Sequence, residues 1–401
     1  MNIPKLDSLI GMDLYSTSTL GTGGSIKKRR EDFLVRETLS KKTLSKITTT
    51  GGYAVYELEK DGIDTNHALA EVQKKTGTRL KALGLKDSRA VTSQYVCATS
   101  KATRITKYDG SKFSIKQIGF SQRPLTAKDM VGNRFSIRVS DSNTDVEIFD
   151  EYDKILNYFG YQRFGSGRPV SHRIGKHIMM KNYDSALQTL LSETSEYDTK
   201  DRTELRKQLA DVSKFAQTFE KIPHSMDLER MAVSELVDGG TAESAIRALP
   251  SRMRRFFVQS FQSYIFNKTI TMAKKTGEEL TTPQKNDVCF NSDGILGRTL
   301  FGEKMQAIAI PLVGHSYYKK TRFDHYIQQI LQEEEISARD FFTPHMQETS
   351  IEGGFRRALL VCSDCTAKDG LVEFTLSRGS YATVVLREII KPENPIMAGF
   401  S

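Results

Sequence analysis

A carboxylate and an ammonium group stand side by side in the segment ALGLKDSRAVTSQYV, which covers residues 82–96. Lys86 and Asp87 follow Gly84 at the end of a short apolar run, where we expect a strand to give way to a loop. An aspartate in such a loop can satisfy nearby backbone amides, which is a structural role. A carboxylate beside a cation can also stay ionised in a partly buried cleft and act as nucleophile or general base. Residue types and spacing alone leave both interpretations open.

The familiar motifs for other chemistries are missing from the sequence. It contains no GxSxG elbow, no Walker A loop and no GxGxxG that opens a helix, which argues against nucleotide cofactors. His172 and His177 are five positions apart in a segment broken by glycines, so we do not expect a shared metal. Cys362 and Cys365 form one CxxC without a second ligand pair, and we interpret them as structural. We therefore expect no metal and no cofactor.

Composition and charge indicate a folded protein with a polyanionic partner. The 401 residues are 38% hydrophobic and carry a formal net charge of +9. Basic residues gather in the stretches IKKRRED, SRMRRF, KKTR and FRR, which favours nucleic acid as the partner. The 21 Phe and 15 Tyr side chains supply rings that can stack on bases. Charge alone does not separate RNA from DNA.

The sequence favours a location in the cytoplasm. The first residues, MNIPKLDSLIGMDL, lack the basic region and apolar core of a secretory signal. No apolar stretch is long enough to span a membrane. The four cysteines are few and scattered, which is typical of a reducing compartment. We therefore expect a cytoplasmic protein that does not enter a membrane.

Alternating and helical patterns predict the elements that must position the candidate residues. Phe33 and Val35 share one face of EDFLVRE, and Phe135 and Ile137 share one face of NRFSIRVS, as in strands. Further strands are predicted at residues 53–60, 356–362 and 371–377, and helices at residues 64–77, 143–160, 251–275, 323–335 and 380–391.

The order of these patterns suggests a domain that is interrupted by an insertion. Residues 161–177 are rich in glycine and basic residues and are predicted to form a loop or junction. Helical patterns dominate from about residue 177 to residue 345, and strand patterns then return. Since 401 residues exceed what one hydrophobic core usually serves, we expect two domains or one large insertion.

The surroundings of Asp87 resemble a known family. The segment GLKDSRAVTSQ is similar to the signature of the TruD family of pseudouridine synthases, in which Gly-x-Lys-Asp-x-x-Ala-x-Thr-x-Gln surrounds the catalytic aspartate. Further blocks resemble the family in the same order, from about residue 26 to residue 391: IKKRREDFLVRE, GNRFSIRV, NYFGYQRFG, FVQSFQSYIFN and FTLSRGSYATVVLREII. One departure is Ser377, which stands where the family commonly has proline before its last helix.

The resemblance implies an α+β fold with two parts. A pseudouridine synthase catalytic domain, with a mixed, mainly antiparallel sheet and helices, would comprise residues 1–163 and 352–401. A large, mainly helical TRUD insertion domain would comprise residues 164–351. The long middle of the chain matches the family only in patches, so the resemblance says less about which RNA it recognises.

The resemblance also implies an activity, the isomerisation of uridine to pseudouridine in tRNA at position 13. Asp87 would either attack C1′ of the ribose or take a proton from C2′, and both routes remain open. No cofactor is implied, the partner would be tRNA, and we expect a monomer. Two alternatives differ in class: an inactive RNA-binding protein of the same fold, and a nucleic-acid N-glycosylase that releases the base.

The resemblance assigns roles to six further residues around a uridine that has left its stack. Phe135 would stack on the uracil, and Asn133 would hydrogen-bond to the nucleotide. Phe33 and Tyr381 would line the pocket, Lys27 would keep Asp87 charged, and Lys86 would meet a phosphate. From the strand pattern alone, Phe33 and Phe135 are equally well explained as core residues.

Overall fold

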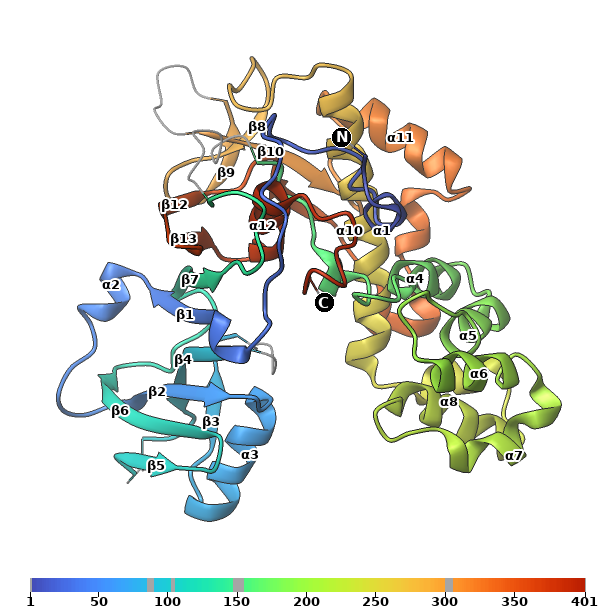
Figure 1. Cartoon of the computed structure of the whole chain (residues 1–401), viewed down its shortest axis with the longest axis horizontal. Coiled ribbons are helices and arrows are strands. Elements are labelled where there is room, and N and C mark those ends of the chain that lie inside the picture. Colours follow the sequence, from blue (N-terminus) through green and yellow to red (C-terminus); the bar gives the residue numbers. More distant parts are fainter. Residues whose placement is uncertain (1, 85–89, 102–104, 147–154, 300–305, 401) are drawn as a thin grey trace.

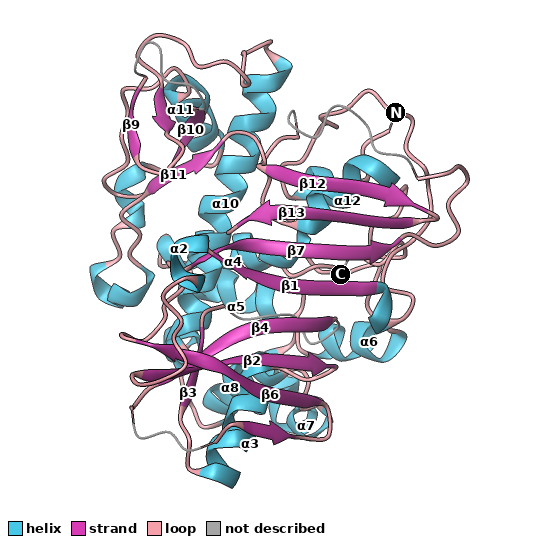
Figure 2. Ribbon diagram, turned by 90° about the vertical axis from the view of Figure 1, so that its left-hand side faces the viewer, coloured by secondary structure: helices cyan, strands magenta, loops and turns pink. Residues whose placement is uncertain are grey.

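A computed structural model of the protein describes residues 2–84, 90–101, 105–146, 155–299 and 306–400. Nine of the described strands form one sheet in the order β12-β13-β7-β1-β4-β2-β6-β5, and β3 pairs with β4 outside this path (Figure 2). These strands are β1 (Phe33–Leu39), β2 (Tyr53–Asp61), β3 (Leu80–Ala82), β4 (Val91–Ala98), β5 (Lys107–Asp109), β6 (Phe113–Ser121), β7 (Met130–Arg138), β12 (Cys362–Lys368) and β13 (Leu371–Ser377).

The two halves of this sheet meet at a parallel pair. Strands β1 and β4 run side by side in the same direction, with Leu34 opposite Val91. Every other described pairing in the sheet is antiparallel. The prediction of a mixed, mainly antiparallel sheet is therefore confirmed, as is the α+β class.

A helix packs on each half of the sheet. Helix α3 (Thr65–Thr76) covers the half built from β2, β4 and β6. It begins at Asp64, whose carboxylate accepts hydrogen bonds from the backbone N–H groups of Asn66 and His67, and it ends at Gly77 with a φ of 72°. Both ends of the helix predicted at residues 64–77 are therefore capped. Helix α12 (Ala382–Ile390) packs in the core of the other half, and all nine of its residues are buried.

A buried ion cluster ties the start of the chain to α12. The Nε atom of Arg387 donates to Asp7 of α1 (Lys5–Leu9) over 2.5 Å, and its Nη1 atom donates to Glu388 over 3.2 Å. Both arginine and aspartate side chains are fully buried. Burial disfavours the charged guanidinium, but the two carboxylates outweigh this effect and raise the pKa of Arg387. The carboxylate of Glu388 also accepts from the backbone N–H groups of Ser16 and Thr17.

The middle of the chain is mainly helical and contains a second, small sheet in the order β11-β10-β8-β9. Its strands are β8 (Val288–Phe290), β9 (Leu296–Arg298), β10 (Ala307–Leu312) and β11 (Gly354–Arg357), and the sequence did not predict them as a sheet. The helices are α4 (Ser171–Met179), α5 (Tyr183–Leu191), α6 (Lys200–Gln208), α7 (Phe215–Thr218), α8 (Asp227–Val237), α9 (Ala242–Ala248), α10 (Ser251–Lys275) and α11 (Asp324–Glu333).

Helix α10 passes between the helices α4–α8 and the part of the molecule that contains α12 (Figure 1). In its first half, Phe257 and Phe261 belong to the hydrophobic core of the helical region, whose buried residues all lie between residues 170 and 351. In its second half, Phe266 and Ile270 belong to the core that also contains β1, β7, β13 and α12. One helix therefore contributes to both cores.

Two predictions for the junction before α10 are wrong. The helix predicted at residues 143–160 does not reach its predicted end, since residues 155–160 are not helical and Leu156 forms a β-bridge with Leu359. The side chain of Asn267 accepts from the backbone N–H of Phe159 and donates to its carbonyl, which replaces helical hydrogen bonds. The loop predicted at residues 161–177 contains much of α4.

The glycine that suggested a loop allows α4 to contact α10 closely. A Cβ atom at Gly175 would lie 2.0 Å from the carbonyl oxygen of Phe257. We expect Gly175→Ala to lower the free energy of unfolding by about 1–3 kcal/mol, because the two helices must move apart. Urea denaturation measures this change. Gly297→Ala is the control, since no atom lies within 4 Å of its added Cβ, and an equal loss in both variants would contradict the packing argument.

A carboxylate next to β7 predicts how stability depends on pH. The guanidinium of Arg123 lies 2.6 Å from Asp129 and, despite partial burial of the carboxyl, lowers the pKa of Asp129 to about 2. The ionised carboxylate therefore stabilises the fold above pH 4, and this contribution of about 2 kcal/mol disappears as the pH falls towards 2. Unfolding of wild type and Asp129→Asn at several pH values tests this. The prediction is wrong if the free energies of unfolding of the two proteins differ by the same amount at every pH below 4.

Candidate active site

The residues that raised the question of chemistry, Lys86 and Asp87, lie outside the described residues, but both flanks of their segment are described. The carbonyl of Gly84 accepts a hydrogen bond from the Gln94 side chain over 3.1 Å. On the other side, Ala90 is fully buried and leads into β4. Since Leu34 pairs with Val91 in parallel, β4 begins at the same end of the sheet as β1 and its first residue, Phe33.

Three phenylalanine rings follow one another across neighbouring strands at this place. The rings of Phe33 and Phe135 are 6.3 Å apart in an edge-to-face arrangement, and Phe135 lies 5.4 Å from Phe374. Phe33 and Phe135 both belong to the main core and keep 7% of their surface exposed. Both therefore contribute to packing at a point where a small part of each ring remains accessible.

Asn133 lies two residues before Phe135 on β7, so both side chains are on the same face of the sheet. It pairs with Glu37 of β1 on one side and with Leu376 of β13 on the other, and it is half-buried. The carboxylate of Glu37 accepts from the backbone N–H of Tyr95 over 2.9 Å. The register thus places an amide group beside the aromatic rings.

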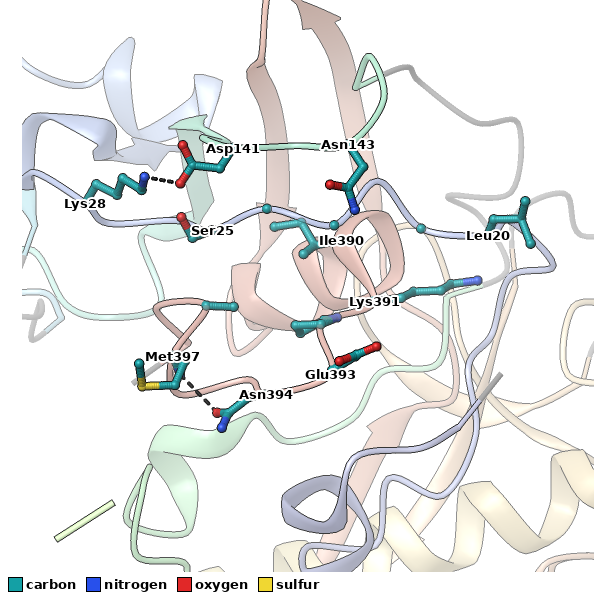
Figure 3. Close-up of a pocket in the computed structure, with 15 residues that line it drawn as sticks. Leu20, Ser25, Lys28, Asp141, Asn143, Ile390, Lys391, Glu393, Asn394 and Met397 are labelled. Carbon is teal, nitrogen blue, oxygen red and sulfur yellow. Dashed lines mark hydrogen bonds and ion pairs between the residues drawn. The ribbon is translucent and has the colours of Figure 1, made fainter. Parts of the chain in front are cut away.

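Lys27 and Lys28 have different partners. Lys27 has a left-handed backbone conformation with a φ of 57°, and its ammonium group lies 4.8 Å from the centre of the Phe33 ring. Lys28 forms an ion pair with Asp141 and lines a cavity of about 620 Å³ between residues 20–28, 141–143 and 390–398 (Figure 3). None of the predicted site residues lines this cavity.

Tyr381 stands at the N-cap of α12 and is half-buried. Its ring lies 6.1 Å from that of Phe159, and a Cβ atom at Gly160 would be 3.1 Å from it. The turn before it is closed by a hydrogen bond from Ser380 N to the carbonyl of Ser377, whose hydroxyl groups are 3.3 Å apart. A serine therefore serves this turn where the resemblance implied a proline.

The contacts bring the predicted residues into two groups. Lys27, Phe33 and Phe135 follow one another at the start of β1, and Asn133 is on the same sheet face as Phe135. Tyr381 contacts Phe159 of the junction segment, and Phe159 belongs to the same hydrophobic core as Phe33 and Phe135.

Comparison with known proteins adds to this geometry. The model of the family "tRNA pseudouridine synthase D (TruD)" matches residues 9–389. The chain belongs to the TruD family. A relative from Pyrobaculum islandicum named "Probable tRNA pseudouridine synthase D" is 30% identical, with 99% of each chain covered. A relative of the same name from Archaeoglobus fulgidus is also 30% identical, over 97% of this chain and 100% of its own.

A crystal structure of a TruD protein from Methanosarcina mazei has the same fold. It superimposes with a TM-score of 0.76 at 27% sequence identity, and the match covers 98% of this chain and 99% of that one. The fold class expected from the resemblance is thereby confirmed, and the chain is a pseudouridine synthase of the TruD type.

In this TruD-family protein, two arginines that the sequence did not single out lie next to Phe159, the ring that contacts Tyr381. The guanidinium of Arg356 lies 4.1 Å from the centre of the Phe159 ring, and that of Arg163 lies 5.4 Å from it. Arg163 lies in the segment 161–177, already noted as rich in basic residues, and Arg356 lies in the basic stretch FRR. The missing signal was their proximity to one ring, which depends on the course of residues 155–160.

The described part of the chain contains no group of three or more His, Cys, Asp or Glu side chains placed to hold a metal ion. His172 and His177 lie on α4, so the segment that was expected to be broken by glycines is helical. The ring of His172 stacks on that of Tyr264, and burial lowers the pKa of His172 to about 3. The sulfur atoms of Cys362 and Cys365 are 3.2 Å apart on β12. Among the described helices, none is both long and apolar enough to span a membrane.

Proposed function

We propose that this TruD-family chain isomerises uridine to pseudouridine in tRNA, at position 13, with Asp87 as its catalytic group. Membership of the family over residues 9–389 supports the reaction class and the substrate. The observation that carries the assignment of Asp87 is the parallel register of β1 and β4. It brings Ala90 and Val91, which follow the segment of this aspartate in the sequence, to the end of the sheet where Phe33 contacts Phe135.

The side chains described at this place suit a uridine that has left its stack. Phe135 offers an aromatic ring to the uracil, and Asn133 offers an amide to its polar edge. Phe33 and Tyr381 close the pocket, and Lys27 supplies a positive charge that favours ionised Asp87. Lys86, the neighbour of Asp87, binds a phosphate.

Two routes use the same aspartate. Asp87 attacks C1′ and displaces the uracil, and C5 of the uracil later displaces Asp87 from C1′. Alternatively, Asp87 takes the C2′ proton, the uracil leaves and a glycal forms, and the proton returns to C2′ when C5 bonds to C1′. In both, the N1–C1′ bond breaks, the uracil turns, and C5 forms the new bond to C1′. The C5 proton is then lost to solvent while N1 gains one, so the reaction needs no oxidant, reductant or metal.

Release of tritium from C5 tests the reaction directly. tRNA labelled at C5 of uridine is incubated with the wild-type protein and with Asp87→Ala as control. We expect label in water from the wild type only. Equal release from both proteins would overturn the proposal, and tight binding without release would favour an inactive RNA-binding protein. Free uracil together with an abasic site would identify an N-glycosylase.

The target position has its own test. A tRNA transcript with uridine at position 13 is compared with a matched transcript that carries cytidine there. We expect one pseudouridine in the first transcript and none in the second, as read by chemical mapping. Modification of other uridines in both transcripts would place the target elsewhere.

We also propose a division of labour between two domains. Residues 1–163 and 352–401 form the catalytic domain, and residues 164–351 form the insertion, in line with a separate hydrophobic core between residues 170 and 351. The protein acts as a monomer in the cytoplasm. Light scattering of the free protein gives the mass, and a dimer mass would contradict this part of the proposal.

A further inference from the structure

Phe159 contacts two guanidinium groups beside Tyr381. The central carbon of Arg356 lies 4.1 Å from the centre of this ring and that of Arg163 lies 5.4 Å from it. Arg163 also lies 5.4 Å from the ring of Phe256, on α10. In the described part of the chain, neither arginine forms an ion pair with a carboxylate.

Five other arginines, whose side chains expose little surface, have a different kind of partner. Five arginine side chains that are at most 17% exposed each pair with at least one carboxylate. These pairs are Arg168–Glu229, Arg206–Glu229, Arg254–Glu348, Arg322–Glu278 and Arg387–Asp7. At these five places a protein carboxylate balances the charge of the arginine.

Arg356 is held in place by neutral oxygens. Its Nε atom donates to the carbonyl of Asn157 over 2.9 Å, and its Nη1 atom donates to the carbonyl of Gly379 over 2.9 Å. Its Nη2 atom donates to the Asn157 side chain over 2.7 Å and to the carbonyl of Tyr158. Burial and the neighbouring charge of Arg163 lower the pKa of Arg356 to about 10, although Tyr381 opposes this. Among the residues that the structure describes, no carboxylate forms an ion pair with this guanidinium.

Arg163 is oriented by rings alone. Its side chain donates no hydrogen bond to any described residue, and its Nε atom is buried without a partner. The buried Nε–H of Arg163 has no acceptor among the described residues, and leaving such a donor unpaired next to a second positive charge is unfavourable. The side chain as a whole is only half-buried, so a ligand can reach it. An anion that accepts hydrogen bonds from Arg163 would also balance the charge of Arg356, whose own donors are mostly used within the protein.

We propose that Arg163 and Arg356 bind one backbone phosphate of the RNA substrate, adjacent to the flipped uridine. The planar guanidinium matches the spacing of two phosphate oxygens, so Arg163 can bind them in a bidentate manner while Arg356 adds charge. The inference rests on the proposed function for its location, because Tyr381 of the proposed pocket lies 6.1 Å from the shared Phe159 ring. Holding this phosphate fixes the backbone on one side of the uridine and so favours the flipped state.

Neutral phosphates in the substrate provide the test. Single methylphosphonates are placed, one at a time, at the phosphates that flank the target uridine, and the Kd of each tRNA is measured. For the wild type, we expect one position to weaken binding by about 10- to 100-fold. Arg163→Ala should weaken binding of unmodified tRNA by a similar factor and lose its sensitivity to that one position. The slope of log Kd against log salt should fall by about one for this variant.

Three variants separate the proposal from a structural role. Arg163→Lys keeps the charge and should recover part of the affinity, and Arg163→Gln replaces Arg163→Ala if the latter unfolds. Arg230→Ala is the matched control, since Arg230 also stacks on a ring, that of Phe219, and donates to backbone carbonyls on the helical part. It should keep the wild-type pattern. If the Arg163 variants and the wild type respond identically to every methylphosphonate, the inference is wrong.

Failure of this inference can be told apart from failure of the proposed function. Tritium release by the wild type reports the reaction, whereas methylphosphonate sensitivity reports the phosphate contact. Release without a sensitive phosphate overturns only the contact. Sensitivity lost in Arg163→Ala without release by the wild type overturns only the reaction.

Discussion

Asp87→Asn is expected to reduce tritium release from C5-labelled tRNA by at least about 10⁴-fold, because an amide can neither attack C1′ nor take the C2′ proton. The change removes one negative charge without changing the size of the side chain. RNA binding, which depends on phosphate contacts, should stay within a few-fold of the wild type. Single-turnover release and Kd measured on the same preparations give both quantities.

The structural interpretation of Asp87 makes the opposite forecast. If this aspartate only satisfies backbone amides in a turn, Asp87→Asn should retain activity, since asparagine also serves such turns. A thermal melt of the variant tests whether lost activity comes from lost folding. Retained turnover, or inactivity that comes with unfolding, would each contradict the catalytic assignment.

The largest effect on stability is expected at Arg387. Arg387→Met would leave Asp7 and Glu388 as two buried carboxylates without their cation. Removing one partner of a buried ion cluster costs about 3–5 kcal/mol. The midpoint of urea unfolding, with a fitted slope, measures this loss.

An exposed pair supplies the control for this variant. Arg30 lies 3.2 Å from Asp61, and both side chains are about half exposed, at 52% and 49%. Arg30→Met should therefore cost less than about 1 kcal/mol. A loss at Arg387 as small as that at Arg30 would show that the buried cluster contributes little. If Arg387→Met does not fold, adding Asp7→Leu and Glu388→Leu should restore folding, because this cluster then contains no charged side chain.

Much of the fold could be predicted because its signals are local. Helix α10 occupies the predicted residues 251–275, where a continuous helical stripe follows Pro250. Helix α3 is set by Asp64 at one end and Gly77 at the other. Strands β1 and β7 follow from side-chain alternation, which needs no knowledge of the partner strand.

The errors arise where a distant residue decides the local structure. Residues 155–160 have a helical pattern, but the Asn267 side chain forms hydrogen bonds with the backbone N–H and carbonyl of Phe159. The residues next to Phe159 in the sequence do not indicate these bonds. Gly175 suggested a loop, yet it allows a close contact between α4 and α10. The small sheet of β8 to β11 consists of short strands, three to six residues long, whose alternation is too brief to detect.

The site residues were named from a resemblance, and their roles remain predictions. What the structure adds is their relation in space: Phe33 against Phe135, Lys27 against Phe33, and Tyr381 against Phe159. Arg163 and Arg356 could not be paired from the sequence, since almost two hundred residues separate them and only the course of the junction joins them at one ring.

The order of strands in the large sheet has a consequence for how the protein is made. Strand β7 can pair with its neighbour β13 only after the helical middle, which lies between them in the sequence, has been translated. That middle contains a hydrophobic core between residues 170 and 351, and β7 keeps an open edge while these residues are being made. Tyr381 and Arg387 emerge after β13. A chain that ends before α12 lacks Arg387 and leaves Asp7 without this ion-pair partner, so a prematurely terminated protein is expected to be less stable.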